Sequence, residues 1–218
     1  RDFNAVFRVR NLLSFAVHSF FQERGFIWAH TPLITASDCE GAWETFQVTT
    51  LDLENPPKNE DGTVDYSQDF FSSKASLTVS GQLQGEAFSM GYRNIYTFGP
   101  TFRAENSNTK THAAEFWMIE PEICFCDLEG VMDIEEDMLK YIVAKTLERA
   151  PEEMEFLNKF VAPGLIEKLQ KLLDSKFTRI THEEVIKILK EAKVDWEFKP
   201  EYGEDIAKEH EKYITEIS

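Results

Sequence analysis

The chain has 218 residues, of which 42% are hydrophobic and 13% aromatic; this composition indicates a globular protein with a substantial core and excludes an intrinsically disordered one. Its 39 acidic and 23 basic residues give a formal net charge of −16, so its surface should repel nucleic acid unless a basic patch or another domain supplies the attraction. Three cysteines, no secretion signal and no membrane-length apolar run lead us to expect a reducing, cytoplasmic setting without a membrane partner.

The N-terminal segment predicts a long amphipathic helix followed by an edge strand. From Asn4 to Arg24 apolar residues recur every three or four positions, and Gly25 ends the pattern. The extended run from Phe26 to Ile34 contains Pro32, which cannot donate a hydrogen bond to a neighbouring strand. We therefore expect this run at a sheet edge or at a subunit boundary.

A glycine-containing turn is the next informative feature. After a loop of small and acidic residues at 35–44 and breaker-rich residues 55–62, the strand-like run 77–79 leads into Ser80-Gly-Gln-Leu-Gln-Gly-Glu86. Glycines at such a turn let the backbone approach a ligand closely. An ordinary turn, whose polar side chains cap the segment from Ala87 to Tyr92, accounts for the same residues.

The stretch from Tyr96 to Phe125 predicts a β-hairpin with one charged face, and the rest of the chain is organised around it. Side chains alternate between the faces of a strand, so the following sets should each share one side: Thr101, Arg103 and Glu105, and on the return strand Phe116, Met118, Glu120 and Glu122. If both sides face one cleft, they suit a nucleotide triphosphate. The guanidinium would bind the phosphates, the aromatic ring would stack on the base, and a carboxylate would accept from the exocyclic amine. An edge hairpin with an arginine–glutamate ladder explains the spacing equally well.

The sequence contains neither the Gly-x-x-x-x-Gly-Lys-Ser/Thr pattern nor the Gly-x-Gly-x-x-Gly pattern of phosphate-binding loops. ATP would therefore have to be held on the sheet by Arg103, Glu105, His112 and Phe116. Cys124 and Cys126 lie two apart on the expected return strand, without a second Cys/His pair at zinc spacing. We expect structural cysteines and no metal ligand within this chain.

The remainder of the chain predicts helices. Asp127 can cap a helix from Leu128 to about Arg149, with apolar residues such as Val131 facing inward. A second helical region, 151–174, should be interrupted near Pro163-Gly164, and a capping box at 181–184 should open a helix through residue 192. A last acidic helix is expected over 204–217.

Several longer segments bear a resemblance to a known family. Thr97-Phe-Gly-Pro-Thr-Phe-Arg-Ala-Glu, the loop with His112 and Glu115-Phe-Trp-Met-Ile-Glu-Pro-Glu closely resemble motif 2 of the class II aminoacyl-tRNA synthetases. The first helix ending in Thr31-Pro-Leu-Ile resembles motif 1. Residues 35–42, Thr-Ala-Ser-Asp-Cys-Glu-Gly-Ala, and 77–86, Leu-Thr-Val-Ser-Gly-Gln-Leu-Gln-Gly-Glu, are similar to the asparaginyl-tRNA synthetases of the bacterial type.

The resemblance implies an α+β fold, an antiparallel β-sheet flanked by helices that is incomplete on its C-terminal side. Residues 1–126 would be the motif 1 and motif 2 part of the catalytic domain. Residues 127–200 would be a helical insertion within that domain, and residues 201–218 the start of the returning catalytic segment.

Carried over position by position, the resemblance assigns roles to the candidate residues. Arg103, the catalytic residue, would hold the α-phosphate of ATP; the other ATP-binding residues would be Glu105 at the adenine amine, Phe116 stacked on adenine and His112 near the outer phosphates. Asparagine would be bound by Glu40 at its α-amino group, by Ser80 and Gln82 along the pocket, and by Glu86 at its carboxamide. The related aspartyl enzymes carry a lysine where Gly85 stands, so the missing cation and the added acceptor of Glu86 favour asparagine over aspartate.

The implied reaction is attack of the asparagine carboxylate on the α-phosphate of ATP, followed by transfer of the asparaginyl group to tRNA(Asn). The implied partners are asparagine, ATP with Mg²⁺, tRNA(Asn) and a second copy joined through the first helix and the Pro32 strand. The anticodon-binding barrel, the magnesium ligands and the motif 3 arginine do not appear within residues 1–218, so we expect little activity from this chain alone. Alternatives are a tRNA-independent paralogue that activates an amino acid, and a non-catalytic nucleotide or amino-acid binding module.

Overall fold

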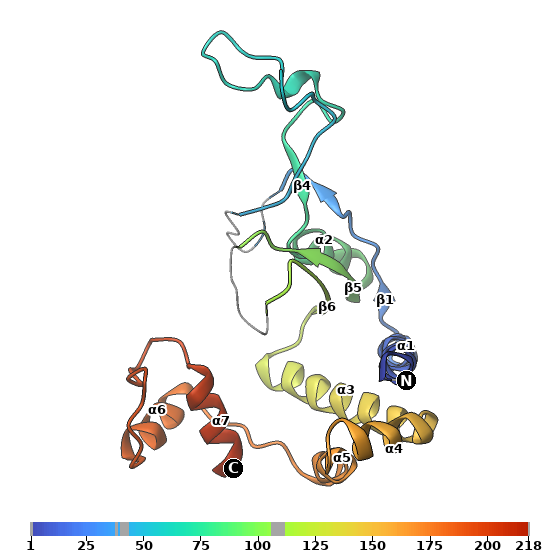
Figure 1. Cartoon of the computed structure of the whole chain (residues 1–218), viewed down its shortest axis with the longest axis vertical. Coiled ribbons are helices and arrows are strands. Elements are labelled where there is room, and N and C mark those ends of the chain that lie inside the picture. The colour runs from blue at the N-terminus through green and yellow to red at the C-terminus, as the bar shows by residue number, and fades with distance from the viewer. Residues whose placement is uncertain (1, 38, 40–43, 106–111, 218) are drawn as a thin grey trace. The chain divides into compact units, whose positions relative to one another are not determined.

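The computed structural model describes residues 2–37, 39, 44–105 and 112–217 (Figure 1). The chain divides into two compact units, residues 1–166 and 167–218, each considered by itself. The division falls inside residues 127–200, where a single helical insertion is expected, and that expectation stays a prediction.

The first unit is built on the expected hairpin. Strands β5 (Asn94–Phe102) and β6 (Glu115–Ile123) pair antiparallel without a break, from Asn94 opposite Ile123 to Phe102 opposite Glu115. Strand β1 (Ile27–Trp28) runs parallel to β5 on its other side, giving the order β1-β5-β6. The extended run after the first helix is therefore an edge strand, as expected, although Pro32 itself lies beyond its end.

One face of this sheet is apolar and carries the core. Helices α1 (Asp2–Glu23) and α3 (Leu128–Arg149) pack against each other (Figure 1). Their inward side chains meet those of β5 and β6 in a cluster that includes Val17, Phe20, Phe21, Phe26, Tyr96 and Ile142. Tyr96 is fully buried, and the Phe21 ring stacks on it at 4.4 Å between centroids. Val131, expected to face inward from α3, is instead 40% exposed, because the buried part of that helix begins further along.

The opposite face of the sheet is polar and is covered by helix α2 (Gln82–Tyr92), which contacts both long strands (Figure 1). Strand β6 ends at Ile123, and Phe125 adopts a left-handed backbone with φ of 59°. The expectation that Cys124 and Cys126 share one face of a strand is therefore wrong. Both thiols are free, and that of Cys124 donates to the carbonyl of Ser89 in α2.

A second sheet, in the order β2-β4-β3, consists of short antiparallel strands: β2 (Ile34–Thr35), β4 (Ala75–Leu77) and β3 (Gln47–Val48). Between β3 and β4 the chain forms an arm, residues 49–74, with a single 3₁₀ turn, η1 (Tyr66–Gln68). Within the arm an isolated antiparallel β-bridge joins Lys58 to Val64 and closes the breaker-rich segment.

The carboxylate of Asp69 anchors this arm. It accepts hydrogen bonds from the Thr49 hydroxyl at 2.6 Å, from the Thr50 amide and hydroxyl at 2.9 Å each, and from the Phe70 amide at 2.8 Å. These donors, the Thr49 hydroxyl foremost, lower the pKa of Asp69 to about 2.

Local sequence signals set the helix boundaries. Asp127 caps α3 by accepting from the Gly130 amide at 2.9 Å. Helices α4 (Pro151–Phe160) and α5 (Leu165–Asp174) are separated where expected, at Gly164 with φ of 83°.

In the second unit, Thr181 and Glu184 form the expected capping box of α6 (His182–Glu191). Helix α7 (Lys208–Ile217) begins four residues later than residue 204, because the buried His210 ring accepts the Ala207 amide at 3.2 Å through Nδ1 and bonds the Phe198 carbonyl through Nε2. None of the helices over the described residues is long and apolar enough to span a membrane.

The Asp69 anchor makes the stability of the arm depend on pH. Its folded-state pKa lies below the ordinary aspartate value, so its contribution is present above about pH 4 and is lost as the pH falls towards 2. Asp69→Asn should lower the urea midpoint at pH 6, and the difference from the unchanged chain should vanish by about pH 2. Asp52→Asn, an exposed change in the same arm, should have little effect; an equal loss in the two variants would contradict the anchor.

Candidate functional site

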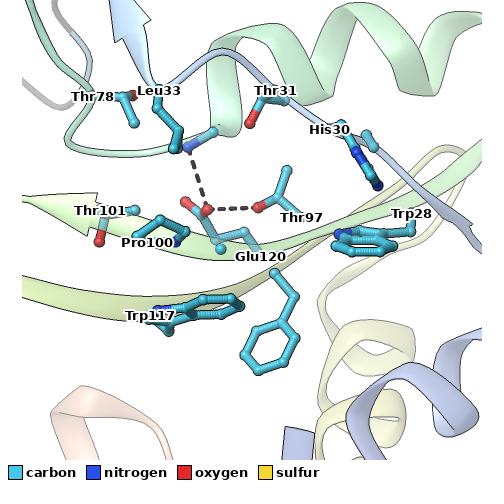
Figure 2. Close-up of a pocket in the computed structure, with 14 residues that line it drawn as sticks. Trp28, His30, Thr31, Leu33, Thr78, Thr97, Pro100, Thr101, Trp117 and Glu120 are labelled. Atoms are coloured by element: carbon cyan, nitrogen blue, oxygen red, sulfur yellow. Dashed lines mark hydrogen bonds between the residues drawn. The ribbon is translucent and has the colours of Figure 1, made fainter. Parts of the chain in front are cut away.

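The carboxylate of Glu120 is the point on the polar face where three segments of the chain converge. It sits opposite Thr97 in the β5–β6 ladder, and the Thr97 hydroxyl donates to Oε2 at 2.6 Å. The Ser80 hydroxyl donates to Oε1 at 2.5 Å, and the Gly81 amide donates to Oε2 at 3.3 Å. Ser80 is only 1% exposed and Thr97 4%, so these charge-assisted bonds lie largely out of water and fix the carboxylate firmly. Figure 2 shows the bond from Thr97 to Glu120.

The turn at Ser80 both approaches this carboxylate and opens helix α2. The Ser80 hydroxyl accepts the Gln82 amide at 3.0 Å while it donates to Glu120. The Thr78 hydroxyl donates to the Ser80 carbonyl at 2.6 Å and holds the turn from behind. A Cβ at Gly81 would stand 2.6 Å from the Thr31 hydroxyl oxygen and 2.9 Å from a Thr97 methyl carbon. The helix therefore begins at Gln82 and not at Ala87, and the Ser80 hydroxyl accepts the first amide of the helix. The close approach that Gly81 allows is to Thr31 and Thr97, and approach to a ligand stays a prediction.

A cavity of about 250 Å³ borders Glu120 on the side of the chain that connects β1 and β2. Its wall includes Thr31 and Thr78 across from Glu120, with the rings of Trp28 and Trp117 towards its ends (Figure 2). Of the predicted ligand residues that the structure describes, none lines this cavity. The cavity lies next to Glu120, and we assign no substrate to it.

Arg103 and Phe116 lie together further along the same face. Thr101 pairs with Phe116, and the Arg103 amide donates to the Ala114 carbonyl at 3.0 Å, so the pairing continues one step past the end of β5. The Arg103 guanidinium carbon is 5.5 Å from the centroid of the Phe116 ring, within cation–π range. The alternation of strand side chains thus predicted this contact correctly.

The other predicted ATP residues border the hairpin loop. Glu105 and His112 are both exposed and flank residues 106–111. Those six residues lie outside the described part of the chain. So does Glu40, in the loop at 35–44. Among the residues that are described, no group of three or more His, Cys, Asp or Glu side chains is arranged to hold a metal ion.

The predicted asparagine residues on α2 lie one helical turn apart. The Gln82 side-chain amide donates to the Glu86 carboxylate at 3.3 Å, and Glu86 is exposed at the surface. Glu122, on β6, lies near them, and burial, then the charges of Glu86 and Glu120, raise the pKa of its carboxyl. The end of the polar face nearest α2 is therefore acidic.

Sequence reasoning placed Glu120 on the ligand face but did not assign it a role. Its three donors, at 80, 81 and 97, lie 23 to 40 positions from Glu120 in the chain. The sequence contains one feature that could have predicted the bond between Thr97 and Glu120. The two strands alternate with period two, so both residues lie on one side of the hairpin once its register is known.

This fold and site define the class of the protein. A family model described as tRNA synthetases class II (D, K and N) matches residues 1–218, and the chain belongs to that family. Its curated relatives include asparagine–tRNA ligases. The one from Acetivibrio thermocellus is 60% identical over 214 residues, which is 98% of this chain and 46% of that protein. Those from Acholeplasma laidlawii and Clostridium novyi are 59% and 57% identical over the same shares. The chain thus spans about half the length of the curated relatives it matches.

Solved structures agree with this placement. Asparaginyl-tRNA synthetase from Pyrococcus horikoshii, solved with asparaginyl-adenylate, matches with a TM-score of 0.75 and 27% identity, covering 100% of this chain and 43% of that one. A putative aspartyl-tRNA synthetase from Leishmania major matches with a TM-score of 0.71 at 20% identity, covering 98% of this chain and 42% of that one, a likeness that shows the fold alone. The expected α+β class II fold is confirmed.

The two glycines of the Ser80 turn should respond differently to an added methyl group. Gly81→Ala would push Thr31 and Thr97 away from their present positions and should destabilise the chain by about 1–3 kcal/mol. At Gly85 the new Cβ would meet Ile95 at 3.4 Å and Glu122 at 3.5 Å, so Gly85→Ala should be neutral, or stabilising by up to about 1 kcal/mol through helix propensity. Urea unfolding of both variants measures this; equal destabilisation would show that the close approach at Gly81 is not special.

Proposed function

We propose that this chain is the motif 1 and motif 2 part of the catalytic core of an asparagine–tRNA ligase, and that its polar face binds ATP and asparagine side by side. The observation that carries the proposal is the common face of β5 and β6. At one end of it the Arg103 guanidinium lies over the Phe116 ring, and towards the other Glu120 is fixed by three donors.

The nucleotide would occupy the Arg103 end. Adenine stacks on Phe116, its amine meets Glu105, and the guanidinium neutralises charge on the α-phosphate as the asparagine carboxylate attacks in line. His112 lies near the outer phosphates. The products are asparaginyl-adenylate and pyrophosphate, and no covalent enzyme intermediate forms. Catalysis consists of positioning and charge neutralisation. Mg²⁺ accompanies ATP, with protein ligands expected outside these residues.

Asparagine would occupy the end of the face near Ser80, Gln82 and Glu86, with Glu40 at its α-amino group. Glu120 already accepts three hydrogen bonds and retains capacity for a carboxamide N–H. An aspartate side chain has the same shape but would bring a second negative charge against this carboxylate, which cannot move away from its donors. The rigid carboxylate therefore favours asparagine.

The acceptor and assembly follow from the same family. The asparaginyl group passes to tRNA(Asn), and the protein acts in the cytoplasm as a homodimer through α1 and the segment around Pro32. Exposed aromatic side chains on α1 support that surface: Phe3 is 79% exposed, Phe7 60% and Phe15 57%.

Phe116→Ala tests the nucleotide half of the site. Loss of the stacking surface should weaken ATP binding roughly 5- to 100-fold, since base–aromatic stacking contributes about 1–3 kcal/mol, and should leave asparagine binding unchanged. Calorimetry with ATP and asparagine in turn measures both. Phe125→Ala, a change of the same size at a ring that is 96% exposed, is the control. Unchanged ATP affinity in Phe116→Ala would leave the proposed adenine site without support.

Glu120→Gln tests the amino-acid half. The amide nitrogen would confront donors that now point at a carboxylate, so asparagine affinity should fall roughly tenfold or more, the loss expected for hydrogen bonds to a charged group. Glu115→Gln removes the same charge from the first residue of β6, where the side chain is exposed and faces the other side, and should change nothing. Calorimetric titration with asparagine that gives equal affinity in all three proteins would contradict the assignment.

A further inference from the structure

Glu122 lies directly beneath helix α2 on the polar face. It pairs with Ile95 and is two positions beyond Glu120, so it shares the side on which Glu120 meets Thr97. Helix α2 passes close above it: a Cβ at Gly85 would stand 3.5 Å from the Glu122 Cγ. The half-buried stem of Glu122 is therefore packed against the backbone of the helix that also carries Gln82 and Glu86.

The surroundings of Glu122 do not favour a charge. In contrast to Glu120, its carboxyl receives no hydrogen bond from the residues that the structure describes. The charges that act on it, those of Glu86 and Glu120, have the same sign as its own, and together with burial they raise its pKa. An apolar residue here would cost the fold less than a half-buried carboxyl beside two others. A charge kept where it is unfavourable indicates a role in the site rather than in the fold.

We propose that Glu122 is a further specificity-determining residue of the amino-acid site, one that excludes aspartate through its charge without touching the substrate. The inference rests on the proposed function. Two residues of β6 then have different roles. Glu120 binds the carboxamide of asparagine directly. Glu122 raises the electrostatic penalty for any ligand that places a carboxylate next to Glu120.

The two substrates respond differently to such a charge. Asparagine has a neutral side chain, so a negative charge two strand positions away changes its affinity little. Aspartate would place a fourth carboxylate beside Glu86, Glu120 and Glu122, where partial burial limits screening by water. Gly85 is packed against Glu122 and Thr97 and has no side chain. It therefore offers no cation that could neutralise the three carboxylates.

The test is the ratio of aspartate to asparagine dissociation constants, measured by calorimetry on the whole chain at pH 7. Glu122→Gln should leave asparagine affinity within about twofold and should tighten aspartate binding at least about fivefold, with roughly 30-fold as the Coulomb limit for removing one charge about 8 Å away at an effective dielectric constant near 20. Glu122→Asp keeps the charge and should keep the discrimination. Glu115→Gln, on the other side of the same strand, should leave both affinities unchanged.

Each outcome decides between the possibilities. A discrimination ratio in Glu122→Gln equal to that of the unchanged chain overturns this inference and leaves the proposed function standing. Equal weakening of both ligands in Glu122→Gln and Glu122→Asp shows a purely structural role and also overturns it. Absence of asparagine binding by the unchanged chain overturns the proposed function and this inference with it.

Discussion

The antiparallel pairing of β5 with β6 is the constraint on which the rest of this structure depends. Nine consecutive residue pairs fix the register, and the register decides which side chains lie on which face. Tyr96, Phe98, Ile119 and Ile123 then face α1 and α3, while Thr97, Phe116, Glu120 and Glu122 face away from them. A slip of one residue would exchange the two sets, bury the carboxylates in the core and expose its aromatic rings. The core and the site are therefore specified by one set of hydrogen bonds.

The polar face becomes a site because a third segment closes on it. The Ser80 turn uses its hydroxyl twice, as acceptor for the first turn of α2 and as donor to Glu120, so the helix cannot move without disturbing the carboxylate. Glycine at position 81 allows this approach, since a Cβ there would stand only 2.6 Å from the Thr31 hydroxyl oxygen and 2.9 Å from a Thr97 methyl carbon. The Ser80 hydroxyl thus takes part both in the start of helix α2 and in the geometry around Glu120, and this double use helps to hold Glu120 rigid.

Sequence reasoning succeeded where the determining interaction is local or periodic. The caps at Asp127 and Thr181 involve residues three apart, and strand alternation suffices to bring Arg103 to Phe116. It failed where distant segments decide. Glu120 is bonded to donors 23 to 40 positions away in the chain, and the Asp69 anchor joins residues about twenty positions apart. The left-handed Phe125 ends a strand that composition would continue through Cys126. No local propensity encodes these contacts, because each follows from tertiary packing.

The order of charges along β6 gives the site a direction. Phe116, under the Arg103 guanidinium, and Glu120 are four residues apart, about 13 Å along an extended strand, and Glu122 continues the acidic end by about 7 Å more. A ligand that is anionic at one end and neutral or cationic at the other fits this face in only one orientation. In the proposed function an aminoacyl-adenylate would place its base and phosphate at the Arg103 end of the face and its uncharged asparagine side chain at the acidic end. A nucleotide alone would satisfy only the Arg103 end, and a free amino acid only the other. In the proposed function the acidic end would thus set the orientation in which a two-part ligand binds.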